Sequence, residues 1–239
     1  MVLLHGMGAT GAVWRRVVEV LPERSGRVVV CDLPGHGASD QLEDYSPPAV
    51  AAAVAGAVAG ALPGDGLVAL VEHSFGGYVA LLLAADRHGL DVSAVVATGV
   101  KVSWTPDELE RTATFASRSP SSFDSQADAE ARYRKVAGLT EDVTGDVRDL
   151  ARGVVEIEGR FRLSHDPRSA AVGVPDVAGA LEATSVPALL SRGVTDPMVS
   201  RDDLLRFSPD AVDIPGGGHA IHVQQPRAFV DHVMAFLGT

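Results

Sequence analysis

Short apolar runs alternate with segments of helical pattern along most of this chain, and this alternation restricts the folds open to it. The runs are rich in Val, Leu and Ala, as strands are when both faces of a sheet are covered. They lie at residues 1–5, 27–31, 67–73, 94–98, 188–191 and 211–214. Helices are expected between them, at residues 12–21, 48–62, 77–87, 200–207 and 226–237. This order predicts an α/β fold with a mostly parallel sheet of about six strands flanked by helices.

The composition of the chain argues against nucleic-acid and membrane partners. The chain has 239 residues, 46% of them hydrophobic and 21% charged, which is ample for a buried core. Its formal net charge is −11 and it has no basic cluster, so we expect no nucleic-acid partner. The Ala- and Gly-rich stretch at residues 49–62 is shorter than the about 20 residues that span a bilayer, so we expect a packed helix and no membrane partner. The amino terminus lacks the basic region of a secretory signal peptide, and we expect a cytoplasmic protein.

The apolar run at residues 67–73 ends abruptly at Ser74, and a helical pattern begins after two glycines. Residues 72–77 read Glu-His-Ser-Phe-Gly-Gly. A strand that turns sharply into a helix lifts one side chain clear of the sheet and directs free N–H groups toward it. A nucleophilic serine needs both an exposed hydroxyl and such donors. The segment resembles the nucleophile elbow, G-x-S-x-G, of the α/β-hydrolase family.

The resemblance implies a catalytic acid and a catalytic histidine later in the chain. Asp196 follows the run at 188–191, in a turn that Pro197 closes, and His219 follows three glycines. The chain order Ser74, Asp196, His219 is the order of the family. We therefore predict that Ser74 is the nucleophile, His219 the base and Asp196 the carboxylate that orients the base.

The resemblance also implies an oxyanion hole made of backbone N–H groups. One donor is expected from Phe75, directly after the nucleophile, and the other from Met7, in a loop that matches the family's H-G-x pattern. Glu72 departs from the family, which has a small residue at this position. Three hypotheses follow: Glu72 packs beside the strand without effect, it reaches the triad or a cap arginine, or it weakens the elbow.

The alternation stops between residues 101 and 184, where no run has a convincing strand pattern. A structureless loop of this length is uncommon in a compact domain, so we expect a helical cap over the active site. The expected division is a core of residues 1–100 and 185–239 and a cap of residues 101–184; the alternative is a surface excursion without a role in substrate binding. The aromatic residues expected to form the pocket are Trp104, Phe115, Phe123, Tyr133 and Phe161.

No metal or cofactor is predicted. The eight histidines are scattered, and Cys31 is the single cysteine, expected to be a buried small side chain. The glycine loops match neither a dinucleotide-binding nor a phosphate-binding fingerprint. We expect His36 to pack within its loop, His73 to face the opposite side of the turn from Ser74, and His222 to lie near the rim of the site.

These features predict a cofactor-free serine hydrolase whose substrate is a small or medium ester, thioester or lactone. Two alternatives stay open. Family members with the same triad cleave C–C bonds or perform perhydrolysis, and a protein with a vestigial triad could bind or cyclise a small molecule. The family also has two strands before the first loop that this sequence lacks, which would expose a sheet edge able to pair with a second copy, so a homodimer is a further expectation.

Overall fold

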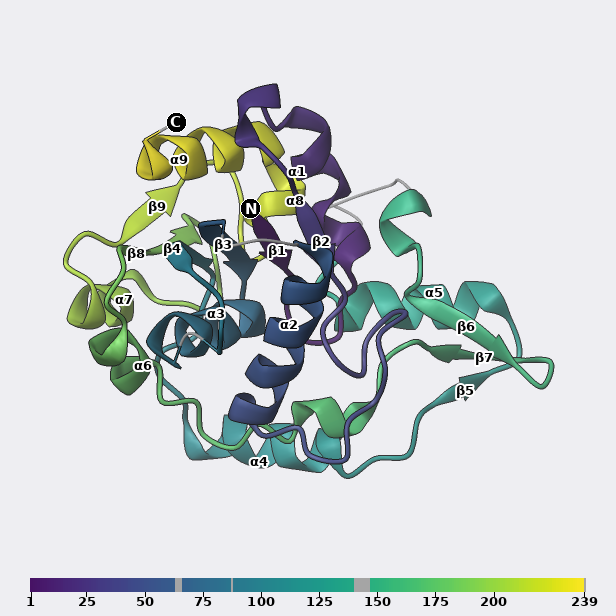
Figure 1. Ribbon diagram of the computed structural model, residues 1–239. Coiled ribbons are helices and arrows are strands. Elements are labelled where there is room, and N and C mark those ends of the chain that lie inside the picture. The colour runs from purple at the N-terminus through teal and green to yellow at the C-terminus, as the bar shows by residue number, and fades with distance from the viewer. Residues whose placement is uncertain (63–65, 87, 140–146, 239) are drawn as a thin grey trace.

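The computed structural model describes residues 1–62, 66–86, 88–139 and 147–238. Its centre is a six-stranded sheet in the order β2-β1-β3-β4-β8-β9, in which every neighbouring pair is parallel (Figure 1). The strands are β1 (Val2–Leu4), β2 (Val29–Cys31), β3 (Val68–His73), β4 (Val92–Thr98), β8 (Ala188–Gly193) and β9 (Val212–Ile214). The predicted α/β fold with a parallel sheet of six strands is confirmed.

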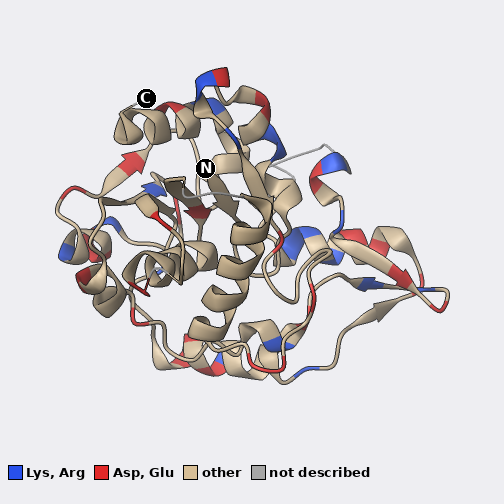
Figure 2. Cartoon of the chain, in the orientation of Figure 1, with Lys and Arg blue, Asp and Glu red and all other residues tan. Residues whose placement is uncertain are grey.

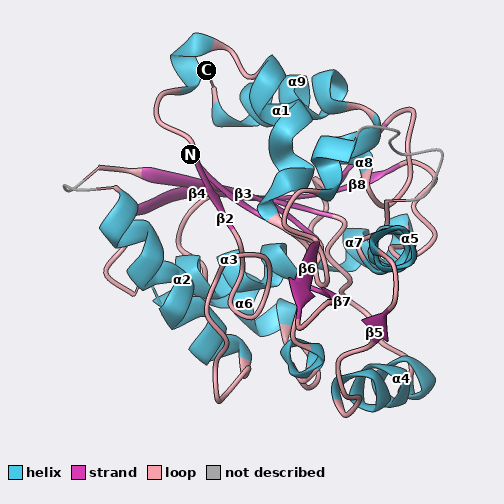
Figure 3. Cartoon of the chain, turned by 90° about the vertical axis from the view of Figure 1, so that its right-hand side faces the viewer, coloured by secondary structure: helices cyan, strands magenta, loops and turns pink. Residues whose placement is uncertain are grey.

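Helices cover both faces of this sheet, as Figure 3 shows edge-on. Alternate side chains of each strand enter two separate cores, so Leu70 packs on one face and Val71 on the other. The first face is covered by α2 (Pro47–Ala61), α3 (Phe75–Asp86), α6 (Val177–Ala183) and α7 (Arg201–Phe207). The second is covered by the 3₁₀ turn η1 (Gly11–Trp14), α1 (Arg15–Val20), α8 (Ile221–Gln224) and α9 (Pro226–Leu237).

Local sequence explains the helix that contains the Ala- and Gly-rich stretch. Prolines occupy the first two positions of α2, where a missing N–H costs nothing. Val50, Val54 and Val58 follow at intervals of four residues and are buried against the sheet. The helix carries no charged residue, as Figure 2 shows. Within the described residues, no helix combines the length and apolar character that a bilayer crossing requires.

Between β4 and β8 the structure corrects the expectation of a helical insertion without strands. A three-stranded antiparallel sheet in the order β5-β7-β6 lies beside the helices. Glu158 and Gly159 both have positive φ, 52° and 75°, as a two-residue hairpin turn requires. The elements are α4 (Pro106–Ala116), β5 (Ser122–Phe123), α5 (Gln126–Val136), η3 (Val147–Leu150), β6 (Val154–Ile157), β7 (Arg160–Leu163) and η4 (Pro167–Ala170).

Candidate active site

Ser74 lies at the sharp turn between β3 and α3. Its φ is 54°, a left-handed conformation that costs a residue with a side chain about 1–2 kcal/mol. The surrounding structure holds this conformation in place. The Ser74 N–H donates to the Thr98 carbonyl at 2.8 Å, and the Gly77 N–H donates to the Ser74 carbonyl at 3.0 Å. Strain of this kind is found at functional sites, where a turn must expose one side chain.

Glycine is needed where the elbow meets its neighbours. A Cβ on Gly76 would lie 2.7 Å from the His5 carbonyl oxygen, and a Cβ on Gly6 would lie 3.1 Å from the Ser74 Cβ. The loop after β1 therefore packs directly against the start of α3. Among the described residues, the backbone N–H groups of Met7 and Phe75 have no hydrogen-bond partner. Both residues line the cavity that contains Ser74, so both N–H groups are available to an oxyanion.

Two buried histidines hold the loop that carries Met7. His5 donates from Nδ1 to the Gly6 carbonyl at 2.8 Å and accepts at Nε2 from the Leu33 N–H at 2.9 Å. His36 donates from Nδ1 to the Pro34 carbonyl and accepts from the Gly8 N–H, both at 3.0 Å. Burial lowers the pKa of His5 to about 4 and that of His36 to about 3, so both rings are neutral at neutral pH, as these bonds require.

The acid and base loops converge at the ends of β8 and β9. The side chain of Asp196 is fully buried, and its Oδ2 lies 2.9 Å from Nδ1 of His219. Its Oδ1 accepts from the N–H groups of Met198 at 2.8 Å and Val199 at 3.3 Å. Gly193 permits this approach, since a Cβ there would clash with carbonyl oxygens of the glycine loop before His219. The carboxylate is thus fixed in orientation and available to stabilise a charged His219.

His219 lies against the end of β4, next to the turn that carries Ser74. A Cβ on Gly99 would lie 3.3 Å from Cε1 of His219. His73, the residue before Ser74, donates from Nε2 to the His219 carbonyl at 2.8 Å, and the two rings are 4.6 Å apart. Among the described residues, the Ser74 hydroxyl has no hydrogen-bond partner. Catalytic hydrogen bonds are often long without substrate and tighten when it binds.

His222, another histidine close to the site, is too deeply buried to act as the base. His222 is 2% exposed and lies in the core instead of at the rim. Its ring packs against those of Trp14 and His73, with centroid distances of 4.5 and 4.3 Å. Burial lowers its pKa to about 3. Burial also lowers the pKa of His73 well below its usual value. His219, at 18% side-chain exposure, is the one of these three rings that is open to solvent and bonded to a carboxylate.

A cavity of about 220 Å³ opens at Ser74. Its walls come from the oxyanion loop, the start of α3, the segment after β4 and the insertion, and they are largely apolar. Residues that line it include Met7, Phe75, Tyr78, Val100, Trp104 and Val172. A serine hydroxyl, free N–H donors and an apolar cavity therefore meet at one point, with a histidine–carboxylate pair beside it.

The comparison with known proteins agrees with this geometry. A family model described as the alpha/beta hydrolase family matches residues 1–232.

The chain belongs to the α/β-hydrolase family.

Relatives of this α/β hydrolase include lipases and esterases. It is 29% identical to the sn-1-specific diacylglycerol lipase ABHD11 of Mus musculus, over 99% of this chain and 80% of the relative. It is also 29% identical to the esterase Rv0045c of Mycobacterium tuberculosis, over 100% of this chain and 83% of the relative. Among solved structures, the thioesterase domain from the curacin biosynthetic pathway has a TM-score of 0.76 at 23% identity, covering 98% of this chain and 89% of that domain. That structural match supports the fold alone.

The five aromatic residues predicted to form the pocket of this hydrolase do not lie together in the structure. Trp104 lines the cavity at Ser74. Phe115 lines a different cavity, and Phe123 and Phe161 face each other as a pair between β5 and β7. Tyr133 is 1% exposed and bonds through its hydroxyl to Thr10 at 3.2 Å, so it joins the insertion to the core. Four of the five predicted residues therefore do not line the cavity at Ser74.

Lys101 is a pocket residue that the sequence analysis missed. Its ammonium bonds to the Glu108 carboxylate at 2.8 Å and lies 5.5 Å from the Trp104 ring centroid. The bond to Lys101 is the main reason that the pKa of Glu108 falls to about 2. The position of Lys101 shortly after β4 could have indicated its place in the pocket, because binding sites of parallel sheets form at the carboxyl ends of the strands.

The side chain of Glu72 points into the protein core. It is fully buried, in register with Leu4 and Ala97 on the face covered by α2 and α3. Neither carboxylate oxygen has a hydrogen-bond partner in the described part of the chain. Burial raises the pKa of Glu72 well above its usual value, so the group is a neutral acid in the core. The structure does not bring it to the triad or to a cap arginine.

Proposed function

We propose that this protein is a cofactor-free serine hydrolase that cleaves a small or medium carboxylic ester, thioester or lactone through an acyl-enzyme on Ser74. The observation that carries the proposal is the bond between the buried Asp196 carboxylate and Nδ1 of His219, beside a serine held at a strained strand-to-helix turn. With Nδ1 bonded to the carboxylate, Nε2 is the ring nitrogen left to exchange a proton.

In this proposal Ser74 attacks the substrate carbonyl carbon while His219 takes the hydroxyl proton. The N–H group of Phe75, at the turn, and that of Met7, in the loop after β1, bind the oxyanion. His219 then protonates the leaving group, which departs as an alcohol or thiol. Water repeats the same steps on the acyl-enzyme and releases the carboxylic acid.

The cavity supports a small acyl group. Its volume of about 220 Å³ lies below the range of typical ligand pockets, about 300–1,000 Å³. Its lining is mostly apolar, and Lys101, the cation among its lining residues, already pairs with Glu108. We therefore expect uncharged short-chain acyl groups to be preferred over long ones.

Steady-state hydrolysis of p-nitrophenyl esters from acetate to palmitate tests the proposal. We expect kcat/KM to be highest for short chains, to fall by about 10⁴-fold or more in Ser74→Ala and His219→Gln, and by about 10³–10⁴-fold in Asp196→Asn. Circular dichroism checks that each variant is folded. His222→Gln is the matched control, since this histidine is buried away from solvent, and a folded variant should retain most activity. Equal activity in wild type and folded Ser74→Ala would refute the mechanism.

A further inference from the structure

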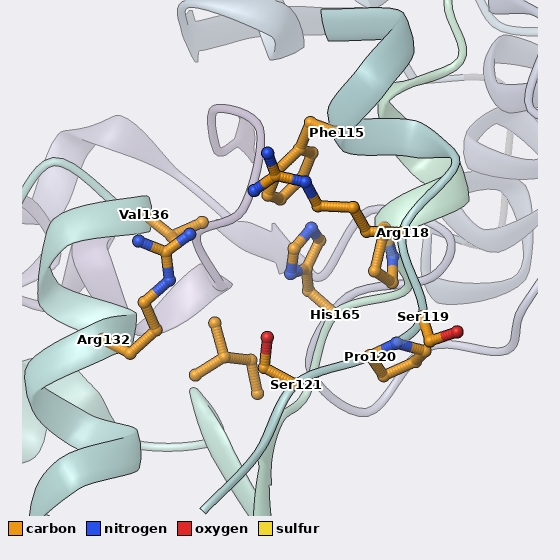
Figure 4. A pocket seen from close by; sticks show the side chains of 10 residues that line it. Phe115, Arg118, Ser119, Pro120, Ser121, Arg132, Val136 and His165 are labelled. Atoms are coloured by element: carbon orange, nitrogen blue, oxygen red, sulfur yellow. The ribbon is translucent and has the colours of Figure 1, made fainter. Parts of the chain in front are cut away.

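A second cavity lies inside the insertion, between α4, α5 and η4. It has a volume of about 40 Å³, enough for a small polyatomic group. Figure 4 shows Arg118 and Arg132 approaching it from opposite sides, with His165 between them. The apolar part of its wall includes Phe115 and Val136, so charges in it are screened less than on an open surface.

Neither arginine has a counter-ion in the part of the chain that the structure describes. Among the described residues, the guanidinium groups of Arg118 and Arg132 make no hydrogen bond and no ion pair. The nearby carboxylate of Asp166 already pairs with Arg168 at 2.7 Å and accepts from the Tyr45 hydroxyl at 3.1 Å. Two unpaired guanidinium groups at one small cavity are notable in a chain whose net charge is −11, because carboxylates are abundant elsewhere.

His165 supplies an independent sign that a ligand is accommodated here. It is 8% exposed, its ring stacks on Phe115 at 5.6 Å and 10°, and neither ring nitrogen has a hydrogen-bond partner among the described residues. Buried polar groups without partners are rare, and each calls for an explanation. Burial is the main cause that lowers the pKa of His165 to about 4, so the neutral ring offers one N–H donor to a ligand.

We propose that this cavity is a binding site for a small oxyanion, a phosphate or a carboxylate group, held between Arg118, Arg132 and His165. Guanidinium groups suit both anions, because their planar N–H donors match pairs of oxygens. The hydroxyl of Ser121, also at the cavity, provides a further donor.

The site is distinct from the cavity at Ser74. The two cavities share no lining residue among the described ones, and α4 packs against η4 between them. Phe115 faces this cavity, while Thr112, one turn earlier on α4, faces the other. A bound anion is therefore a separate small molecule and not the far end of an acyl substrate. The inference stands whether or not the protein is a hydrolase.

Isothermal titration calorimetry with inorganic phosphate and, separately, with acetate at constant ionic strength tests this site. We expect saturable binding of at least one anion to the wild type at a single site. Arg118→Gln/Arg132→Gln should weaken it at least about tenfold, since a charge-assisted hydrogen bond contributes about that much. His165→Gln should also weaken it. Whichever anion binds more tightly identifies the ligand as phosphate or carboxylate.

The control is Arg111→Gln/Arg227→Gln, which removes the same charge from two exposed arginines outside both cavities. The affinity of this control variant for the anion should stay within about twofold of the wild-type affinity. Circular dichroism checks folding, and Arg118→Gln alone, on an exposed side chain, provides a milder variant if the double one unfolds. The proposal is overturned if folded wild type binds neither anion, or if the control loses as much affinity as the cavity variants.

Discussion

Glu72 is a fully buried carboxyl group two residues before Ser74, without a hydrogen-bond partner among the described residues. Burying such a group without a partner costs about 1–3 kcal/mol. Glu72→Met keeps the length of the side chain and removes the polar atoms. We therefore predict that this variant has a free energy of unfolding higher than wild type by about 1–3 kcal/mol at neutral pH, measured by urea denaturation.

The same residue predicts a dependence of stability on pH. Burial raises the pKa of Glu72 in the folded protein above that in the unfolded chain. Stability from this group is thus fully present below the unfolded pKa and falls as pH rises above it, by up to about 1.4 kcal/mol per pH unit. The stability of Glu72→Gln relative to wild type should accordingly increase between about pH 5 and pH 8. A difference that stays constant over this range would show that Glu72 is not the titrating group.

Some features of the residues around Ser74 could be predicted from the sequence. The motif and chain order led to Ser74, Asp196 and His219, and the structure bonds the last two to each other. Side chains alternate along a strand, so Glu72 and His73 had to face opposite sides of β3. The sequence did not tell which helices would cover each of these two faces, because that depends on packing between residues far apart in the chain.

At the scale of elements, the elbow depends on the close approach of α3 to β1. A Cβ on Gly76 would lie 2.7 and 2.8 Å from two backbone carbonyl oxygens, which cannot move without disturbing the sheet. We predict that Gly76→Ala lowers the free energy of unfolding by about 1–3 kcal/mol and reduces the proposed esterase activity. Thermal unfolding and p-nitrophenyl ester hydrolysis measure the two effects.

Gly56 and Gly60 provide the matched control for this prediction. Both lie in α2, and a Cβ on either would meet nothing within 4 Å. Alanine at either position should raise the free energy of unfolding by about 0.5–1 kcal/mol, as expected for a helix interior, and leave activity unchanged. If Gly76→Ala behaved like Gly56→Ala, the packing account of the elbow would be wrong.

The elements of the core followed from sequence more closely than those of the insertion. Apolar runs predicted all six strands of the parallel sheet. The signal was clearest for β3 and β4, which are buried almost throughout, because strands covered on both faces have a largely apolar composition. The strand β7 (Arg160–Leu163) alternates charged and apolar residues over only four positions, too few to recognise with certainty. The Glu-Gly pair at 158–159 was the available hairpin signal, weaker than Asn-Gly or Asp-Gly.

For the whole molecule, attachment of the insertion to the core depends on a buried carboxylate. Asp149 in η3 is fully buried and pairs with Arg15 at 2.7 Å and Arg16 at 3.3 Å. We predict that Asp149→Asn lowers the free energy of unfolding by about 1–3 kcal/mol, because it removes the charge that both arginines face. Asp124→Asn, which removes an exposed carboxylate paired with Arg160, should change it by less than about 1 kcal/mol. Urea denaturation of both variants measures the contrast, and equal losses would argue against a special role for Asp149.

Labelling of the folded protein by a fluorophosphonate probe, followed by intact mass spectrometry and peptide mapping, tests whether Ser74 is an activated nucleophile. The probe reacts with a serine that is activated by a base and faces oxyanion donors. The account predicts one label per chain, on Ser74, absent in Ser74→Ala and strongly slowed in His219→Gln. Folded wild type that takes up no label, or a label that persists in Ser74→Ala, would contradict it.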